Sequence, residues 1–492
     1  MRNRIQKLVQ TVLQTAWVEI RKLTFVGLLV LLSQALLNPG TASALEPTND
    51  AAKQQQTQAS VQLESFDAVW NQVRSQYFDY ARIESAWQEA RETYRPRAAK
   101  ASTAELRRLL NEMLELVGES HFVVLPPTAV NEPDDPSPES EDSSDPADPP
   151  AHAEQNGDDE RPRRPTGLGV RLIDDALIVD RVGPANAGVI ETGWELLAVG
   201  DQSLGGLIDE ALAVEDPTAR ARSRLILEAT ANGLIGFPPD GRDLVLSMKA
   251  PDGELVEITA RTAPEPVQIV RIGNLPGLAF SYRAEIHPEG NGCVGVVTFT
   301  SWVPELMDRF LESRDELFAC QGLVFDLRGN LGGVLTTMMP LTSHLVDETV
   351  LLGQLKREDA RLDFRVFPRM VANDGQRIQP YDGPVAILID SLSASTSEMF
   401  SAGMQALGRA RIFGTQSPGM ALPAQMLPLA NGDRLMYAFA DYIDGQGRRI
   451  EGIGVTPDEV IEPTRATLST GDDPVLKTAM QWIENAPSPE DG

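Results

Sequence analysis

A run of small polar side chains follows one of the most apolar segments of the chain. Residues 385–389 (VAILI) have the length and β-branched content of a strand buried on both faces of a sheet. The polar residues between this strand and the helix expected from Glu398 onward are Asp390, Ser391, Ser393, Ser395, Thr396 and Ser397. A serine at such a junction lies beside unpaired backbone N–H groups and the positive end of a helix dipole, which suits an acyl-transfer nucleophile. The same residue types also cap helices, so this segment alone leaves a structural role open.

Two further segments, one before and one after this serine-rich segment, carry patterns that resemble the same family of proteins. Residues 322–333 (GLVFDLRGNLGG) run from an apolar strand into a glycine-rich turn, and residues 451–460 read EGIGVTPDEV. Together the three segments resemble the catalytic core of the S41 serine peptidases, which include the tail-specific and C-terminal-processing proteases. The resemblance covers nearly all of the chain after residue 60. It implies hydrolysis of peptide bonds through an acyl-enzyme, and no spacing in the sequence indicates a cofactor or a metal site.

The family register implies that Ser395 is the nucleophile, because in the family this serine stands three residues before the glutamate that begins the helix, here Glu398. The amide of Thr396 and one from the turn at Gly332 and Gly333 would then be the oxyanion donors. Glycine suits that turn, since a Cβ would block the approach of a substrate carbonyl.

The base differs from the one that many bacterial members use. Their lysine stands 25 residues after the serine, and that position here is Met420, whose thioether cannot accept a proton. A serine–lysine pair would therefore need another lysine, and Lys356 is the one that precedes Met420 in the core segment.

A second branch of the family, similar to the tricorn protease core, uses a Ser-His-Ser-Glu set instead. Its Ser-His pair follows the N-terminal helices, where this chain has Ser120 and His121, and its glutamate matches Glu451. The resemblance implies that His121 is the base for Ser395, with Ser120 and Glu451 orienting it. An imidazole, with its usual pKa near 6.5, suits a base that works near neutral pH.

Flanking segments predict the elements that position these residues. Residues 61–125 place apolar side chains at helical spacing, and the last of the expected helices begins at Ser102 or Thr103 and ends before Gly118. From residue 267 onward strands and helices alternate, which predicts a largely parallel sheet with helices on its faces. The resemblance implies that this α/β core is similar to the crotonase and Clp-protease fold.

Residues 165–263 differ in character from both neighbours. Gly167, Leu168, Gly169 and Val170 open a strand, and an A-G-x-I pattern and an L-x-V-G-D pattern follow. This segment resembles a PDZ domain, in which the amides of that loop bind a peptide's terminal carboxylate and a strand edge adds the peptide as a further strand. A small β-rich domain that only packs on the core is the alternative. A helical stretch within residues 215–238 is longer than a PDZ domain usually has, and could be a lid or an interface helix.

These patterns divide the chain into five parts. The expected parts are a signal peptide at 1–44, an N-terminal helical domain at 45–125, a linker at 126–164, a PDZ-like domain at 165–263 and an S41 peptidase core at 264–492. The linker is rich in Pro, Asp, Glu and Ser without apolar periodicity, which predicts a flexible segment.

The first 44 residues predict a secretory signal. Basic residues from Arg2 to Lys22 precede an apolar run at 25–32, and an A-x-A site ends at Ala44. We therefore expect export, to the periplasm, with cleavage near Ala44. A retained N-terminal anchor is the alternative, although the apolar run is short for a membrane span, and no later segment predicts one.

Charge and cysteine content limit the partners and the chemistry. The net charge of −28 argues against nucleic-acid binding, because a phosphate backbone needs a basic face. Cys293 and Cys320 lie at or just before two strands expected to be neighbours, so one disulfide or two buried thiols are both compatible with the sequence. The oligomeric state is left open.

Two classes of function fit these residues. The first is an exported serine endopeptidase that acts on proteins or peptides and recruits C-terminal ends through the PDZ-like domain. The second is a catalytically inactive module that binds peptides or lipids on the same fold. The enzyme is favoured, because a binding module could lose Ser395, His121 or Glu451 and this chain keeps all three.

Overall fold

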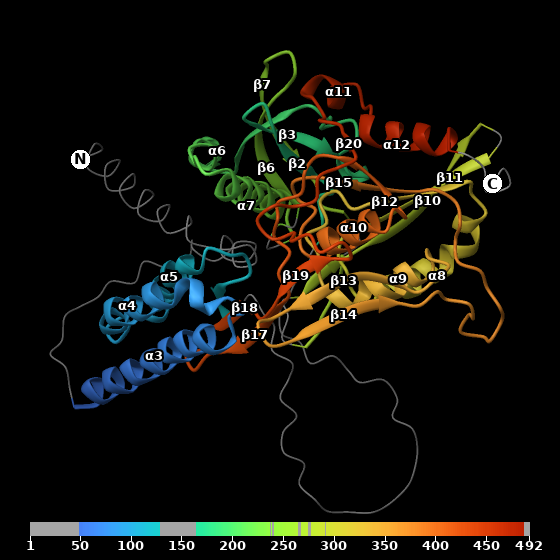
Figure 1. The fold of residues 1–492 in the computed structure, drawn as a ribbon. Helices are drawn as coiled ribbons and strands as arrows, with labels where there is room; N and C mark the ends of the chain where they lie inside the picture. The colour runs from blue at the N-terminus through green and yellow to red at the C-terminus, as the bar shows by residue number, and fades with distance from the viewer. Residues whose placement is uncertain are drawn as a thin grey trace, which may run out of the picture.

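The structure is a computed structural model that describes residues 49–127, 164–236, 238, 241–263, 267–273, 277–290 and 292–486 (Figure 1). The expected signal peptide and nearly all of the expected linker lie outside these residues. Within the described ranges, no helix combines the length and the apolar character that a membrane crossing requires.

Three helices form the N-terminal part, as the periodicity predicts. They are α3 (Asn49–Gln76), α4 (Tyr80–Ala98) and α5 (Thr103–Leu114). The Ser102 hydroxyl caps α5 while the Glu105 carboxylate accepts a hydrogen bond from the Ser102 amide, so both ends of a capping box are present. A 3₁₀ turn, η1 (Glu115–Val117), follows, and Gly118 ends it with φ 69°, a left-handed conformation that favours glycine.

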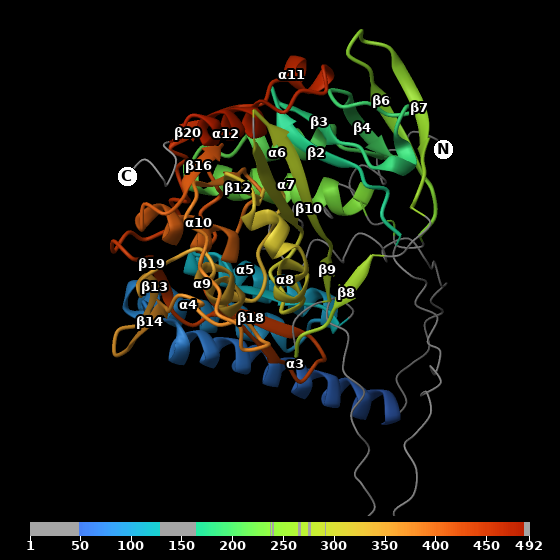
Figure 2. The ribbon, with the colours of Figure 1, turned by 90° about the vertical axis from the view of Figure 1, so that its right-hand side faces the viewer.

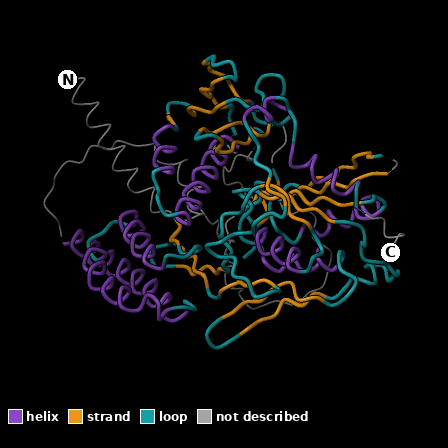
Figure 3. Tube along the Cα trace, turned by 45° about the horizontal axis from the view of Figure 1, so that its top comes forward, coloured by secondary structure: helices purple, strands orange, loops and turns teal. Residues whose placement is uncertain are grey.

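A small sheet joins these helices to the C-terminal part of the chain. Its order is β1-β18-β17, and β1 (Val123–Leu125) pairs antiparallel with β18 (Arg434–Ala438), which pairs with β17 (Ala424–Pro428). Buried Phe66, Trp87 and Leu106 of the helices share one hydrophobic cluster with Leu435 and Tyr437 of β18. Figure 3 shows the three helices grouped on one side of the molecule. The residues just before β1 are thereby fixed against a part of the chain more than 300 positions away.

An antiparallel sheet and two helices form the segment inserted between these parts. The sheet order is β2-β3-β4-β6-β7, with β2 (Gly169–Ile173) and β7 (Leu255–Ala260) at its edges. Its other elements are β3 (Ala176–Arg181), η3 (Pro184–Asn186), β4 (Glu195–Val199), β5 (Gln202–Ser203), α6 (Gly205–Leu212), α7 (Pro217–Gly236) and β6 (Leu244–Lys249). In Figure 1 the segment forms the top of the molecule, and α7 lies on the side of its sheet that faces the rest of the chain.

The core sheet is mixed, with one antiparallel pair at its edge. Its order is β10-β11-β12-β15-β16-β20, and each pair after β10–β11 is parallel. The strands are β10 (Tyr282–Glu289), β11 (Gly292–Phe299), β12 (Gly322–Asp326), β15 (Val385–Ile389), β16 (Arg411–Gly414) and β20 (Glu459–Val460). The prediction of a largely parallel sheet is therefore confirmed.

Helices cover both faces of this sheet, as Figure 2 shows. Alternate residues of β15 point to opposite sides: Ile387 joins the cluster that contains α8 (Glu305–Phe318) and α10 (Thr396–Ala406), and Leu388 joins the cluster that contains α12 (Pro474–Glu484). The remaining elements are β8 (Gln268–Val270), β9 (Leu278–Phe280), η4 (Leu335–Thr337), α9 (Met338–Ser343), β13 (Val350–Lys356), β14 (Arg361–Val366), β19 (Asp441–Asp444) and α11 (Arg465–Ser469).

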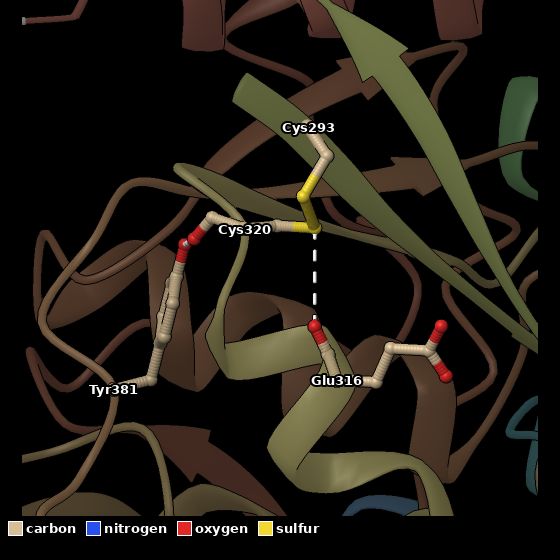
Figure 4. Close-up of a disulfide and its surroundings, with 4 residues drawn as sticks. All are labelled: Cys293, Glu316, Cys320 and Tyr381. Atoms are coloured by element: carbon tan, nitrogen blue, oxygen red, sulfur yellow. Dashed lines mark hydrogen bonds between the residues drawn. A yellow bond between two sulfur atoms is a disulfide. The ribbon is translucent and has the colours of Figure 1, made fainter. Parts of the chain in front are cut away.

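The two cysteines form a disulfide, which decides between the two alternatives that the sequence left open. Cys293 and Cys320 are joined with an S–S distance of 2.04 Å (Figure 4). The carbonyl of Cys320 also accepts a hydrogen bond from the Tyr381 hydroxyl, at 2.9 Å. The bridge lies near the N-terminal ends of β11 and β12, whereas the residues expected to do chemistry follow the C-terminal ends of β12 and β15.

Replacing both cysteines by serine, Cys293→Ser with Cys320→Ser, should lower the free energy of unfolding by about 2–4 kcal/mol. The reason is that the bridge spans 27 residues and removes chain entropy from the unfolded state. Denaturant unfolding monitored by fluorescence measures the change, and wild type in a reducing agent is the control that should show the same loss. An unchanged unfolding midpoint would contradict a stabilising role for the bridge.

Candidate active site

Ser395 is the residue that immediately precedes α10, and its backbone is in an unusual conformation. Its φ is 56° and its ψ is −118°, a region that non-glycine residues rarely adopt and that costs of order 1–3 kcal/mol. Two bonds of its amide hold it there: the N–H donates to the Met420 carbonyl at 3.0 Å and to Glu398 Oε2 at 3.1 Å. The side chain is half-buried.

The glycine turn lies directly against Ser395. A Cβ placed on Gly332 would come within 2.7 Å of the Ser395 Cβ and 2.9 Å of the Ala394 carbonyl oxygen, and φ of Gly332 is 99°. The Gly332 amide donates to Asn330 Oδ1 at 3.0 Å. The amides of Gly333 and Thr396 donate to no group in the described part of the chain. Two N–H groups beside Ser395 are thus free to bind an anion.

Asn330 connects this turn to the serine loop. Besides its side-chain bond to Gly332, its carbonyl accepts the Ala394 amide at 3.1 Å and the Ser397 hydroxyl at 3.0 Å. Nothing in the sequence singles out Asn330, because an asparagine after DLRG indicates a turn but not its partners.

Ser120, His121 and Glu451 form one buried hydrogen-bonded chain. The Ser120 hydroxyl donates to Glu451 Oε2 at 2.9 Å and lies 2.6 Å from His121 Nδ1. A hydroxyl has one proton, so the bond to Glu451 leaves the Ser120 oxygen as the acceptor of an Nδ1–H. His121 is then the tautomer whose Nε2 carries a lone pair, which is what a general base needs.

Burial determines the charge of His121 and affects that of Glu451. His121 and Glu451 are 5% and 1% exposed. Burial lowers the pKa of the His121 imidazole to about 4, with a smaller contribution from Arg222, so the ring is neutral at pH 7. Burial raises the pKa of Glu451, and the positive charge of Arg222 acts against that rise.

One short segment joins the two halves of the site. The Met420 carbonyl accepts the Ser395 amide, and the amide of the next residue, Ala421, donates to Glu451 Oε2 at 2.8 Å. Ser395 and Glu451 are therefore each bound to one of two consecutive residues. His121, like Ser395, has a positive φ, of 61°, and these two are among four non-glycine residues with positive φ in the described chain.

A second buried carboxylate holds the Met420 segment. Glu398 accepts the amides of Gly419 and Met420 at 2.7 and 2.8 Å and the hydroxyl of Ser417 at 2.6 Å. Burial raises the pKa of Glu398 to about 7. The position that would carry a lysine in many bacterial relatives is thus part of a loop fixed by carboxylates, and Lys356 stands exposed at the end of β13.

The loop expected to bind a peptide carboxylate is internally bonded in this structure. The Leu168 amide donates to Thr166 Oγ1 at 3.1 Å, and the Val170 amide donates to Asn232 Oδ1 at 3.0 Å. Gly167 and Gly169 pack closely, Gly167 against the Gly183 backbone and Gly169 against the Arg181 and Asp180 side chains. A peptide that used these amides would have to replace those bonds.

Arg222 of α7 is a site residue that the sequence analysis missed. Its guanidinium lies 3.1 Å from Glu451 Oε1 and donates to the Gly118 carbonyl at 3.1 Å. Helical periodicity indicates which face of α7 is apolar but not which acidic group an arginine on another face meets. In the described residues, no cluster of three or more His, Cys, Asp or Glu side chains could hold a metal ion.

Two family models match parts of this chain. The model of peptidase family S41 matches residues 293–461, and that of the tricorn protease C1 domain matches residues 62–115. A carboxy-terminal-processing protease of Bartonella bacilliformis is 27% identical over 268 residues, which cover 50% of this chain and 57% of that protein. A probable CtpA-like serine protease of Staphylococcus haemolyticus is 22% identical over 263 residues, half of each chain. This chain thus spans little more than half the length of these curated relatives.

Solved structures show the same fold at low sequence identity. Mature CPAF superposes with a TM-score of 0.54 at 13% identity, covering 87% of this chain and 96% of that chain. The photosystem II D1 C-terminal processing protease superposes with a TM-score of 0.50 at 17% identity, covering 83% and 97%. The mixed α/β fold of this chain is that of these proteases, and its residues 293–461 are similar to peptidase family S41.

Proposed function

We propose that this protein is a serine endopeptidase that hydrolyses peptide bonds of proteins or peptides through an acyl-enzyme. The observation that carries this proposal is the buried Glu451–Ser120–His121 chain, bound through one short segment to the serine at the head of α10. The match of residues 293–461 to peptidase family S41 supports the same function, as does the similarity to a carboxy-terminal-processing protease.

In the proposed mechanism, Ser395 Oγ attacks the substrate carbonyl while His121 Nε2 takes the hydroxyl proton. The imidazolium that forms keeps its Nδ1–H bond to Ser120, and the charge of Glu451 stabilises it through that hydroxyl. The amides of Thr396 and Gly333 bind the oxyanion. His121 then gives its proton to the leaving amine. In the second half of the reaction, water attacks the acyl-enzyme while His121 takes its proton, and Ser395 is released with that proton.

The surrounding domains are part of the proposal. Residues 264–492 are proposed as a crotonase-like and Clp-protease-like core, residues 45–125 as the helical domain that supplies His121, and residues 165–263 as a PDZ-like domain. The loop Gly167–Val170 would bind the terminal carboxylate of a peptide after the internal bonds of this loop are exchanged. We also propose that the protein is exported to the periplasm, as its first 44 residues predict.

Cleavage of a fluorescently labelled unfolded protein tests the nucleophile and the base together. Ser395→Ala and His121→Ala should each reduce the rate at least about 10³-fold, because each group takes part in the same proton transfer. Lys356→Ala is the control and should cleave like wild type. Loss of activity in Lys356→Ala but not in His121→Ala would instead identify a lysine base, and no cleavage by wild type would favour the binding module.

Adding one methyl group beside the nucleophile, Gly332→Ala, should reduce kcat by roughly 10²–10³-fold. The new Cβ would overlap the Ser395 Cβ and the Ala394 carbonyl, and the turn that presents the Gly333 amide would have to move. Gly375→Ala is the matched control: φ of Gly375 is 85°, and nothing lies within 4 Å of its added Cβ. Both variants carry similar backbone strain, so equal activity of the two would contradict the role given to this turn.

A further inference from the structure

Helix α7 occupies the position that a neighbouring strand would take beside β2. Asn232 accepts the Val170 amide and donates to the Val170 carbonyl, at 3.0 and 2.8 Å. One turn earlier, Glu228 Oε1 accepts the Leu172 amide at 2.9 Å, and Arg224 donates to the Leu172 carbonyl at 3.3 Å. Because Arg224, Glu228 and Asn232 are spaced by four, they lie on one face of the helix. The outward-facing backbone groups of this edge strand are thus bonded to side chains of α7.

The same helix also contacts the candidate active site. Glu228 Oε2 accepts the hydroxyl of Ser391, in the loop that leads to Ser395. Buried Leu225 and Ala229 pack in one cluster with residues of that loop and of the neighbouring segment, namely Leu392, Ala394 and Met420. α7 is therefore fastened on one side to β2 and on the other to the segments that carry the nucleophile.

Arg222 places a positive charge against the buried end of the hydrogen-bonded chain. Its guanidinium lies 3.1 Å from Glu451 Oε1, and the Glu451 side chain is fully buried. A buried carboxylate that loses its cation is strongly disfavoured as an anion. The other titratable or charged groups around Glu451 are His121, Glu119, Glu398 and Arg449, of which Arg449 bonds to Glu119 and Asp441. Arg222 is thus the cation whose side chain pairs directly with the Glu451 carboxylate in the described structure.

We propose that Arg222 is a positioning residue for the Glu451–Ser120–His121 chain, and that the bonds between α7 and the β2 edge hold it in place. Its ion pair keeps Glu451 ionised and oriented, so that the Ser120 hydroxyl donates to Glu451 and His121 keeps the lone pair on its Nε2. The inserted segment is then a working part of the active site. This inference rests on the proposed peptidase function.

The first test compares Arg222→Met with Arg220→Met. Arg220 is exposed two residues earlier on the same helix, and its guanidinium donates to the carbonyls of residues 214 and 215, so it controls for the loss of one charge from α7. We expect Arg222→Met to lower kcat by about 10–100-fold with little change in KM, and Arg220→Met to resemble wild type.

The pH profile separates positioning from general damage to the fold. Arg222 lowers the pKa of both Glu451 and His121, so its removal raises both. Both groups then become protonated at higher pH, and the acid limb of kcat/KM should move to higher pH. Arg222→Lys keeps a charge and should move the limb back toward its wild-type position. A thermal melt of each variant shows whether it is folded.

The second test changes the β2 edge and leaves the active site untouched. Asn232→Ala removes both hydrogen bonds to Val170. We expect kcat to fall and the acid limb of kcat/KM to move to higher pH, as in Arg222→Met but by a smaller amount. With Arg222→Met already present, Asn232→Ala should add little, because both act through one contact. Full additivity of the two would overturn the link through α7.

The outcomes distinguish this inference from the proposed function. If Ser395→Ala is inactive while Arg222→Met keeps the wild-type rate and pH profile, the peptidase stands and the positioning role is wrong. If Ser395→Ala still cleaves, the proposed function itself is wrong. A folded Arg222→Met with a lower rate and an unmoved acid limb, which Arg222→Lys does not restore, also contradicts the role.

Discussion

A single buried carboxylate, Glu451, is the point at which three distant parts of the chain meet. It accepts hydrogen bonds from the amide and hydroxyl of Ser120 and from the amide of Ala421, and it pairs with Arg222. These partners come from the N-terminal helical part, the core and the inserted segment. An ionised carboxylate is stable in such a place only when its lone pairs are filled, so the assembly of the three parts and the charge of Glu451 depend on each other.

Glu398 has a related role on the other side of the same segment. The loop at Met420 is bound by Glu398 through the amides of Gly419 and Met420 and by Glu451 through the amide of Ala421. A lysine base would need its own approach to the nucleophile at this position. Here the backbone of the segment is used instead to set the distance between the nucleophile loop and the acid, and the side chain of Met420 packs against α7 and the serine loop.

Local patterns in the sequence predict much of this fold. The apolar run of β15, the start of α5 after Ser102 and the left-handed Gly118 that ends the following 3₁₀ turn depend on neighbours within a few residues, and all three occur as expected. Resemblance to the family predicts which residues form the candidate site. It does not predict the hydrogen bonds and ion pairs that hold them. Arg222 and Asn330 act through partners far away in the chain or through one local turn geometry, and no periodicity or composition signals either. Whether Cys293 and Cys320 bond likewise depends on strand register, which the sequence leaves open.

The strained backbone at Ser395 and His121 shows why so many bonds converge on so few residues. Each residue has a positive φ that an isolated chain would avoid, so surrounding contacts must supply the free energy that keeps it there. For Ser395 they are the carbonyl of Met420, Glu398 and the tight approach of Gly332; for His121 they are the Ser120 bond and the pairing of β1 with β18. Both strained residues are thus held by segments that themselves depend on Glu398 or Glu451. Loss of either carboxylate would remove a negative charge and would also loosen the backbone of Ser395 or His121. The two buried acids therefore support the structure of the site in addition to their electrostatic effect.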